Sequence, residues 1–172
     1  LEANSDRVAL CRTGAEAEAA FQAGKAAAFF SAEGAELLDC DLEKLRIAHK
    51  MGVRAVNLTW NHPNALSGTN AKEQDRGLSE QGRAFVREMD ALGMLVDVSH
   101  LSDPGFLSLG GERNVALGGD WDGCTRLPEG IGGIQDMDKL YEALLRRNYS
   151  EELVRGLFYT NLMRVVNEVC NM

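Results

Sequence analysis

Short apolar runs alternate with longer amphipathic stretches along this chain of 172 residues, and that alternation constrains the fold more than any other feature. The apolar runs have the length of β-strands, and turn-forming residues follow each of them, at 24–34, 53–60, 94–100 and 114–120. Stretches with apolar residues along one side predict helices over 41–52, 79–93, 136–147 and 150–169. Strands and helices that alternate at this spacing predict an α/β fold with a parallel sheet.

Capping residues mark the ends of several predicted helices. Asp41 and Ser79 stand where N-caps are expected, and Gly52 and Gly93 stand just beyond the corresponding C-terminal ends. Ser150 is followed by two glutamates, which suit the positive end of a helix dipole. These residues set the helix boundaries that the sequence predicts.

Charge and cysteine spacing exclude several classes of protein. Eighteen Lys and Arg against 26 Asp and Glu give a formal net charge of −8, which disfavours nucleic acid and anionic membranes as partners. No apolar run approaches the roughly 18 residues of a membrane span, and the opening segment lacks the pattern of a signal peptide. The four cysteines lie far apart without a CxxC motif, so reduced thiols and a cytoplasmic location are expected.

Polar side chains with catalytic potential follow the apolar runs, where the chemistry of parallel sheets is concentrated. Glu33, His100 and Asp120 each end such a run, and Trp60 and His62 follow another. Neutral imidazole is a common zinc ligand and a carboxylate can bridge two cations, so Glu33 and His100 are predicted metal ligands. Asp120 is the predicted acid–base residue, since a carboxylate beside metal-bound water can accept and return a proton.

A plainer interpretation exists for each predicted ligand. His100 could be a hydrogen-bonded loop or N-cap histidine, and Glu33 could be a solvent-facing loop acid. Their strand-end positions favour the metal site. Asp97 lies at odd spacing from His100, so it is expected to point to the opposite face and make a structural hydrogen bond or support a ligand. His49 lies within a predicted helix and is expected to be an ordinary surface or core histidine.

The remaining candidates also have alternatives. Asp120 and Asp122 in "GGDWDG" could both be turn residues, an interpretation that is stronger for Asp122 because a glycine follows it. A buried Trp60 would usually serve packing. His62 precedes Pro63 in an extended loop, so it could contact a substrate or only solvent.

The combination of "EG" at 33–34, "DVSH" at 97–100 and "GGDWDG" at 118–123 is specific. With it the chain resembles the membrane dipeptidase (renal dipeptidase) family of zinc peptidases and its bacterial members. The resemblance implies a (β/α)8 TIM barrel of the metal-dependent hydrolase type with two zinc ions. It implies that Glu33 bridges the metals, that His100 binds one, and that Asp120 contacts substrate and catalytic water. A substrate-binding histidine of the family is replaced by Trp60, and His62 is a candidate substitute.

Several family features have no counterpart in this chain. The His-x-Asp zinc ligands of the first strand, a second histidine ligand after His100 and a substrate-binding arginine are missing from the sequence. A full barrel needs about 250 residues, so residues 1–172 are expected to form a single barrel domain that is incomplete as given. One explanation is a deleted, inactive relative. We favour a segment omitted near 106–107 and a missing N-terminal part, because lost strands would leave unpaired sheet edges.

The predicted function is zinc-dependent hydrolysis of dipeptides by a metal-activated water. The alternatives are a non-catalytic degenerate barrel that acts as a binding or scaffold protein, or another metal-dependent amidohydrolase. Dipeptides are the expected partners, with no nucleic acid and no membrane span. Members of the family are often dimers, so the resemblance implies a homodimer as one expected state.

Overall fold

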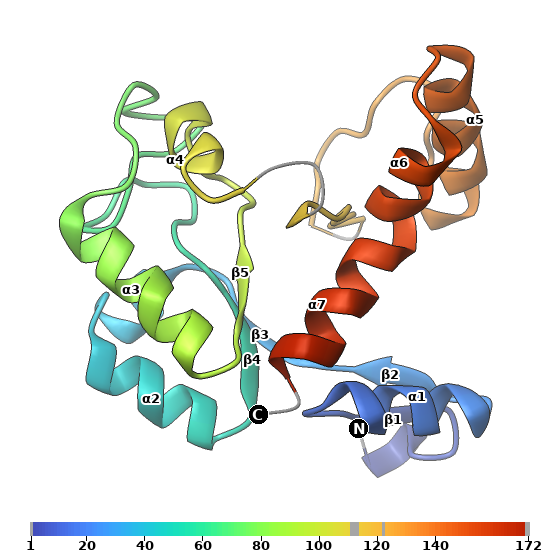
Figure 1. Ribbon diagram of the computed structural model, residues 1–172, viewed down its shortest axis with the longest axis horizontal. Coiled ribbons are helices and arrows are strands. Elements are labelled where there is room, and N and C mark those ends of the chain that lie inside the picture. The colour runs from blue at the N-terminus through green and yellow to red at the C-terminus, as the bar shows by residue number, and fades with distance from the viewer. Residues whose placement is uncertain (1, 111–113, 122, 171–172) are drawn as a thin grey trace. The chain divides into compact units, whose positions relative to one another are not determined.

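A computed structural model describes residues 2–110, 114–121 and 123–170 (Figure 1). The chain divides into two compact units, of which unit 1 comprises residues 1–109 with 165–172, and unit 2 comprises residues 110–164. Beyond a short 3-10 turn, η1 (Glu2–Asn4), strands and helices alternate in unit 1: β1 (Val8–Leu10), α1 (Gly14–Gln22), β2 (Ala26–Ala28), β3 (Phe30–Ala32), the 3-10 helix η2 (Ala35–Leu38), α2 (Leu42–Lys50), β4 (Val53–Asn57), α3 (Glu80–Ala91), β5 (Leu95–Asp97) and α4 (Asp103–Leu107).

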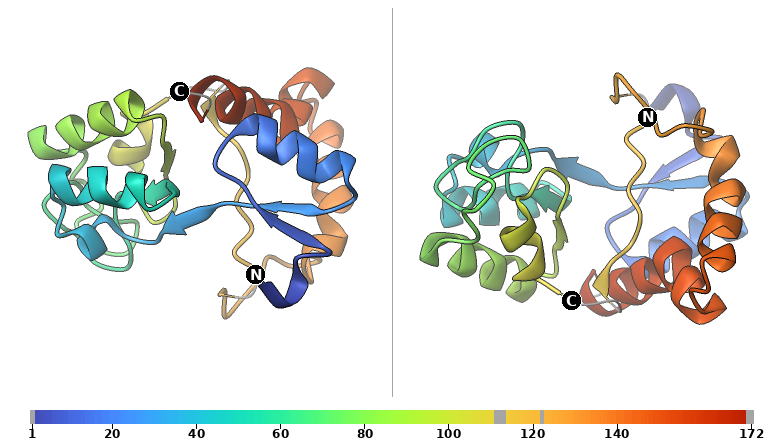
Figure 2. Two further views of the ribbon diagram at one scale, coloured as in Figure 1. Left: turned by 90° about the horizontal axis from the view of Figure 1, so that it is seen from below. Right: turned by 90° about the horizontal axis from the view of Figure 1, so that it is seen from above.

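Every strand pair in unit 1 is parallel, which confirms the predicted α/β class. β1 pairs with β2, and β4 pairs with β3 on one side and β5 on the other. Only Phe29 separates β2 from β3, and Figure 2 shows the two strands following one another along one extended stretch. Within the described residues these strands form two small sheets and no closed barrel.

The core of unit 1 lies on one face of the three-stranded sheet. Val56 and Leu58 alternate with the polar Asn57, and they belong to the same buried cluster as Leu45 of α2 and Phe85 of α3. Figure 1 shows α2 and α3 lying side by side. Burying each such side chain contributes about 1.5–3 kcal/mol, so this packing fixes the position of the strand ends.

The predicted helix caps of unit 1 are confirmed. The side chain of Asp41 accepts a hydrogen bond from the Lys44 N–H at the start of α2, and Ser79 caps α3 in the same way. Gly52 and Gly93 have φ values of 102° and 69°, the left-handed region in which glycine carries no Cβ penalty.

Unit 2 is helical in its described residues. Its elements are η4 (Ile134–Asp136), α5 (Met137–Arg146), α6 (Glu151–Arg155), the π-helical turn η5 (Gly156–Thr160) and the start of α7 (Asn161–Val169). Ser150 caps α6 by accepting from the Leu153 N–H, as the sequence predicts. The rings of Tyr141 and Phe158 pack edge to face at 5.2 Å between centroids, which joins α5 to the following helical stretch.

The predicted strand over 114–120 is wrong. Residues 115–120 form no regular element, and their backbone bonds to helices instead of to a neighbouring strand. The Leu117 N–H donates to the Leu157 carbonyl at 3.0 Å, and Asn161 Nδ2 donates to the Val115 carbonyl at 2.8 Å. An apolar run becomes a strand only when another strand supplies hydrogen-bond partners, and unit 2 has none among its described residues.

None of the described helices is both long enough and apolar enough to cross a membrane. The four cysteines are free thiols, as predicted. Cys11, Cys40 and Cys170 are buried, and burial raises the pKa of each thiol. These three cysteines therefore act as small apolar residues.

Candidate functional site

The structure brings Glu33 and His100 together. Glu33 directly follows β3, and His100 lies three residues beyond β5. Although β4 lies between these strands, Glu33 Oε1 and His100 Nε2 are 3.4 Å apart. The two side chains therefore meet across the end of β4, at the edge of the sheet where the sequence places the site.

His100 adopts a backbone conformation that few residues tolerate. Its φ of 67° lies in the left-handed region, in which histidine is enriched among residues other than glycine. The His100 carbonyl accepts from the Asn70 N–H at 3.0 Å, and Leu101 forms an antiparallel bridge with Thr69. Conformations of this kind persist where the surroundings fix them, and they cluster at functional sites.

Asp97 begins the turn that ends at His100. Its Oδ1 accepts from the Ser99 N–H at 2.9 Å, which confirms the expected structural hydrogen bond. Asp97 is also the register partner of Asn57 on β4. Pairing with β4 and this local bond together fix the path of the chain toward His100.

Trp60 and His62 lie in the loop that follows β4. Trp60 is 44% exposed, so the packing role of a buried tryptophan does not apply to it. His62 is exposed, and its Nδ1 lies 3.2 Å from Lys72 Nζ. Both side chains are thus accessible to a ligand, while their role in substrate binding stays a prediction.

Sequence reasoning missed Glu36, which organises this loop. The backbone N–H of Trp60 donates to Glu36 Oε1 at 3.2 Å, and Asn64 Nδ2 donates to Glu36 Oε2 at 2.9 Å. The available signal was the second acid in "EGAE", three residues after Glu33, which places a further carboxylate at the same strand end.

Asp120 belongs to unit 2, where it closes a tight turn. Its φ is 43°, and its carbonyl accepts from the N–H groups of Gly123 and Cys124, each at 3.1 Å. Desolvation, followed by the nearby Asp120 carboxylate, raises the pKa of the Cys124 thiol. Asp122 lies outside the described residues. The turn interpretation of Asp120 is confirmed for its backbone, and the convergence of its side chain with Glu33 and His100 stays a prediction.

Glu33 and His100 are residue types that bind metal ions, but two ligands are fewer than a zinc site uses. Carboxylate oxygen and imidazole nitrogen are both zinc donors, and zinc sites use roughly three or four protein ligands. Within the described part of the chain, no group of three or more His, Cys, Asp or Glu side chains could hold a metal ion. The described residues alone therefore do not complete a metal site.

The family model of membrane dipeptidases (peptidase family M19) matches residues 1–109 and 106–172. The chain belongs to this family. Among curated relatives, the dipeptidase tcpJ of Claviceps purpurea (strain 20.1) is 39% identical over 105 residues, which are 60% of this chain and 25% of that protein. The chain thus spans about a quarter of the length of that relative.

Solved structures share the fold over nearly the whole chain. A metallo peptidase from Rhodobacter sphaeroides, liganded with a phosphinate mimic of L-Ala-D-Ala, matches with a TM-score of 0.74 and 22% identity, over 98% of this chain and 70% of that one. The M19 dipeptidase AC matches with a TM-score of 0.75 and 22% identity, over 99% of this chain and 72% of that one. An amidohydrolase from Pseudomonas aeruginosa matches with a TM-score of 0.72 and 18% identity, over 99% of this chain and 81% of that one. At these identities the likeness establishes the fold alone.

The two family matches meet where the sequence predicts an omitted segment. They overlap at residues 106–109, and α4 runs through this point, with the Ser108 N–H donating to the Pro104 carbonyl at 3.2 Å. The omission of residues near 106–107 stays a prediction.

Proposed function

We propose that the complete protein is a zinc-dependent dipeptidase and that residues 1–172 form part of its (β/α)8 barrel. Membership of the membrane dipeptidase family supports the reaction class. The observation that carries the proposal is the 3.4 Å approach of Glu33 Oε1 to His100 Nε2 at the carboxyl end of a parallel sheet. This edge is where parallel α/β folds place their catalytic groups.

In this proposal Glu33 and His100 are two of the ligands of a site that binds two zinc ions. The zinc pair supplies the activation of water and the polarisation of the peptide carbonyl. Asp120 handles the proton or the amino group of the substrate, and Trp60 and His62 contact the dipeptide. The remaining ligands come from the segments whose omission the sequence predicts.

The exposure of Glu33 and His100 and the net charge of the chain both support this assignment. Glu33 is 55% and His100 is 25% exposed at the side chain, so a ligand from solvent can reach both. The chain has an excess of acidic residues, with a net charge of −8, which favours cations and disfavours polyanions. A cytoplasmic location and a homodimer are part of the proposal and follow from the sequence and the resemblance only.

The test is hydrolysis of a panel of L,L- and L,D-dipeptides by the complete protein after chelation and re-addition of zinc. We expect no hydrolysis after chelation and recovery with zinc. Hydrolysis that is equally fast without any divalent cation would contradict the proposal. Cleavage of cyclic amides in place of dipeptides would identify another metal-dependent amidohydrolase.

A second candidate is a non-catalytic relative that acts as a binding or scaffold protein. The observation in its favour is the number of donors, since the described residues supply a pair and no larger group. Metal analysis of the purified protein separates the two candidates, because the dipeptidase holds zinc and the scaffold holds none.

A further inference from the structure

The loop between β4 and the N-cap of α3 comprises residues 58–78. It contains no helix or strand, yet hydrogen bonds tie it to the two connections that carry Glu33 and His100. Glu36, in η2, receives bonds from its first part, and the His100 carbonyl receives a bond from Asn70. Leu66 of the loop is fully buried in the core of unit 1. The loop is therefore attached both to the core of unit 1 and to the connections that contain Glu33 and His100.

The Glu36 carboxylate uses both of its oxygens to hold this loop. Oε1 accepts from the Trp60 N–H at 3.2 Å, and Oε2 accepts from Asn64 Nδ2 at 2.9 Å. Hydrogen bonds to an ionised acceptor are roughly twice as strong as neutral ones. Glu36 thus fastens the stretch that contains Trp60 and His62 to the connection that begins with Glu33.

Asn64, which is bonded to Glu36, also forms hydrogen bonds to residues on both sides of that stretch. Its Nδ2 also donates to the Leu58 carbonyl at 2.7 Å, and its Oδ1 accepts from the N–H groups of Leu66 and Ser67 at 2.8 and 3.4 Å. The donor and acceptor sides of one amide are both in use. An apolar residue at position 64 would leave several of these groups without partners.

Gly34 provides the space that the Glu36 carboxylate occupies. A Cβ at position 34 would lie 2.7 Å from the Glu36 carboxyl carbon, and the φ of Gly34 is 103°. Only glycine combines this backbone conformation with so close an approach. The second residue of the "EG" motif therefore allows Glu36 to fold back toward Trp60.

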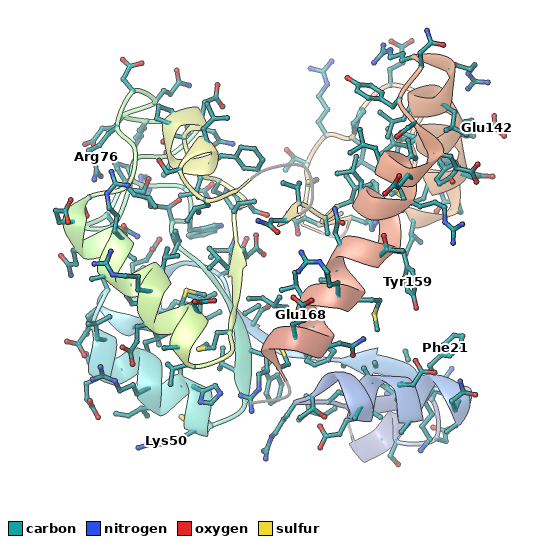
Figure 3. All side chains as sticks on the ribbon, in the orientation of Figure 1. Phe21, Lys50, Arg76, Glu142, Tyr159 and Glu168 are labelled. Carbon is teal, nitrogen blue, oxygen red and sulfur yellow. The ribbon has the colours of Figure 1, made fainter. Side chains whose placement is uncertain are left out.

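Arg76 carries the connection on to the turn that holds His100. Its Nη2 donates to the carbonyls of Asn64 at 2.7 Å and Ser67 at 2.8 Å, and its own carbonyl accepts from Ser102 Oγ at 2.7 Å. Figure 3 shows Arg76 beside the start of α3. Hydrogen bonds thus run from Glu36 through Asn64 and Arg76 to Ser102, two residues beyond His100.

We propose that Glu36 is a positioning residue that holds the Trp60–Asn64 stretch in place for dipeptide binding. This inference rests on the proposed function, in which Trp60 and His62 contact the substrate. The Glu36 carboxylate bonds directly to Trp60 and Asn64, whereas the turn at His100 is also held by Asn70 and by the bridge between Thr69 and Leu101. Loss of the carboxylate is therefore expected to displace the substrate contacts more than the reacting groups. Glu36 therefore governs KM more than kcat.

The decisive variant is Glu36→Gln in the complete protein. Glutamine keeps an oxygen for the Trp60 N–H, but its amide nitrogen cannot accept from Asn64. Loss of a hydrogen bond to a charged group predicts a KM raised by about tenfold, with kcat changed by less than about twofold. The matched control is Glu43→Gln, since Glu43 is an exposed acid of α2 paired with Arg46, and its KM stays that of the wild type.

A second test exchanges the donor and the acceptor between positions 36 and 64. It gives an independent result if Glu36→Gln alone folds poorly. Asn64→Asp sets a second carboxylate against Glu36 and is expected to raise KM at least as much as Glu36→Gln. Combining Glu36→Gln with Asn64→Asp restores a donor opposite an acceptor at the contact with residue 36, although not at the Leu58 carbonyl, so its KM is expected to fall below that of Asn64→Asp alone. A KM for the combination that equals the product of the two single effects would overturn the pairing.

Fluorescence provides a readout that does not depend on activity. Residues 1–172 contain two tryptophans, Trp60 and Trp121. In a background in which every tryptophan of the complete protein except Trp60 is replaced by Phe, Glu36→Gln is expected to increase the quenching of Trp60 by acrylamide and to shift its emission to longer wavelength. Unchanged KM in an active enzyme, or unchanged Trp60 quenching, overturns the inference. A wild-type protein that hydrolyses no dipeptide overturns the proposed function instead, and the quenching of Trp60 still decides whether Glu36 holds the loop.

Discussion

His100 and Asp120 take the same kind of backbone conformation in two different settings. Their φ values are 67° and 43°, and each follows an apolar run of the sequence. His100 follows β5, which pairs with β4, and its carbonyl is bonded to Asn70 of a separate loop. The run before Asp120 forms no strand, and the Asp120 carbonyl closes a local turn with Gly123. A motif can fix the local backbone, while a sheet is needed to place a side chain against a distant partner.

The largest effect that tests this comparison is expected for His100→Ala. The variant removes a proposed metal ligand that the sheet places beside Glu33, so dipeptide hydrolysis by the complete protein should be abolished. The measurement is kcat/KM with added zinc. His49→Ala is the control, because His49 lies at the opposite end of the βα unit, near the end of α2, and its activity should persist. Retained activity in His100→Ala removes that residue from the mechanism.

The next effect tests whether the Asp120 side chain has a catalytic role in addition to the turn that its backbone carbonyl closes. Asp120→Asn keeps the backbone turn but removes the proton-accepting charge. Loss of a general acid–base residue predicts a kcat lower by about 10²–10⁴-fold. Asp138→Asn, an exposed change on α5, serves as the control and should leave kcat unaltered. A wild-type kcat in Asp120→Asn would assign this residue to the turn alone.

A smaller effect, on stability, compares the cores of the two units. Phe85 of α3 is fully buried, whereas α5 contains no buried residue. Phe85→Ala should lower the free energy of unfolding by about 3–5 kcal/mol. Leu140→Ala on α5 should lower it less, because Leu140 is only half-buried. Urea denaturation followed by circular dichroism measures both, and equal losses would show that unit 2 is packed as firmly as unit 1.

The smallest effect is a pH dependence that arises within unit 1. Burial, and then the positive charge of Arg54, lower the pKa of His49. As the pH falls below about 6.5, His49 takes up a proton more readily in the unfolded chain than in the folded one. The free energy of unfolding therefore decreases with falling pH in this range, until the pH reaches the lower pKa of the folded state. His49→Gln should make that decrease shallower, and an identical pH profile would argue against the lowered pKa.

Much of unit 1 could be predicted because its signals are local. Asp41 and Ser79 cap helices as expected, and the apolar runs before Glu33 and His100 form strands. α1 was missed, although its capping box from Thr13 to Glu16 is readable in the sequence. The alternation of strands and helices also predicted a parallel sheet, so Glu33 and His100, which each follow a strand, were expected at the same edge.

The remaining features depend on contacts between distant segments. The hold of Glu36 on Trp60 and Asn64 joins two connections that no local pattern relates. The run at 114–120 has the composition of a strand, but Leu117 bonds to the Leu157 carbonyl of a helical stretch. Strand formation depends on a neighbouring strand, and the composition of one run does not reveal its neighbour.

Zinc bound to the complete protein tests the central claim most directly. Wild-type protein and the Glu33→Gln/His100→Ala double variant are dialysed against the same zinc buffer, and the metal per chain is measured by elemental mass spectrometry. The account predicts that the wild-type protein retains zinc and that the double variant has lost it while keeping its fold by circular dichroism. Equal zinc in the two proteins, or none in the wild type, would contradict the claim that these two residues form part of a metal site.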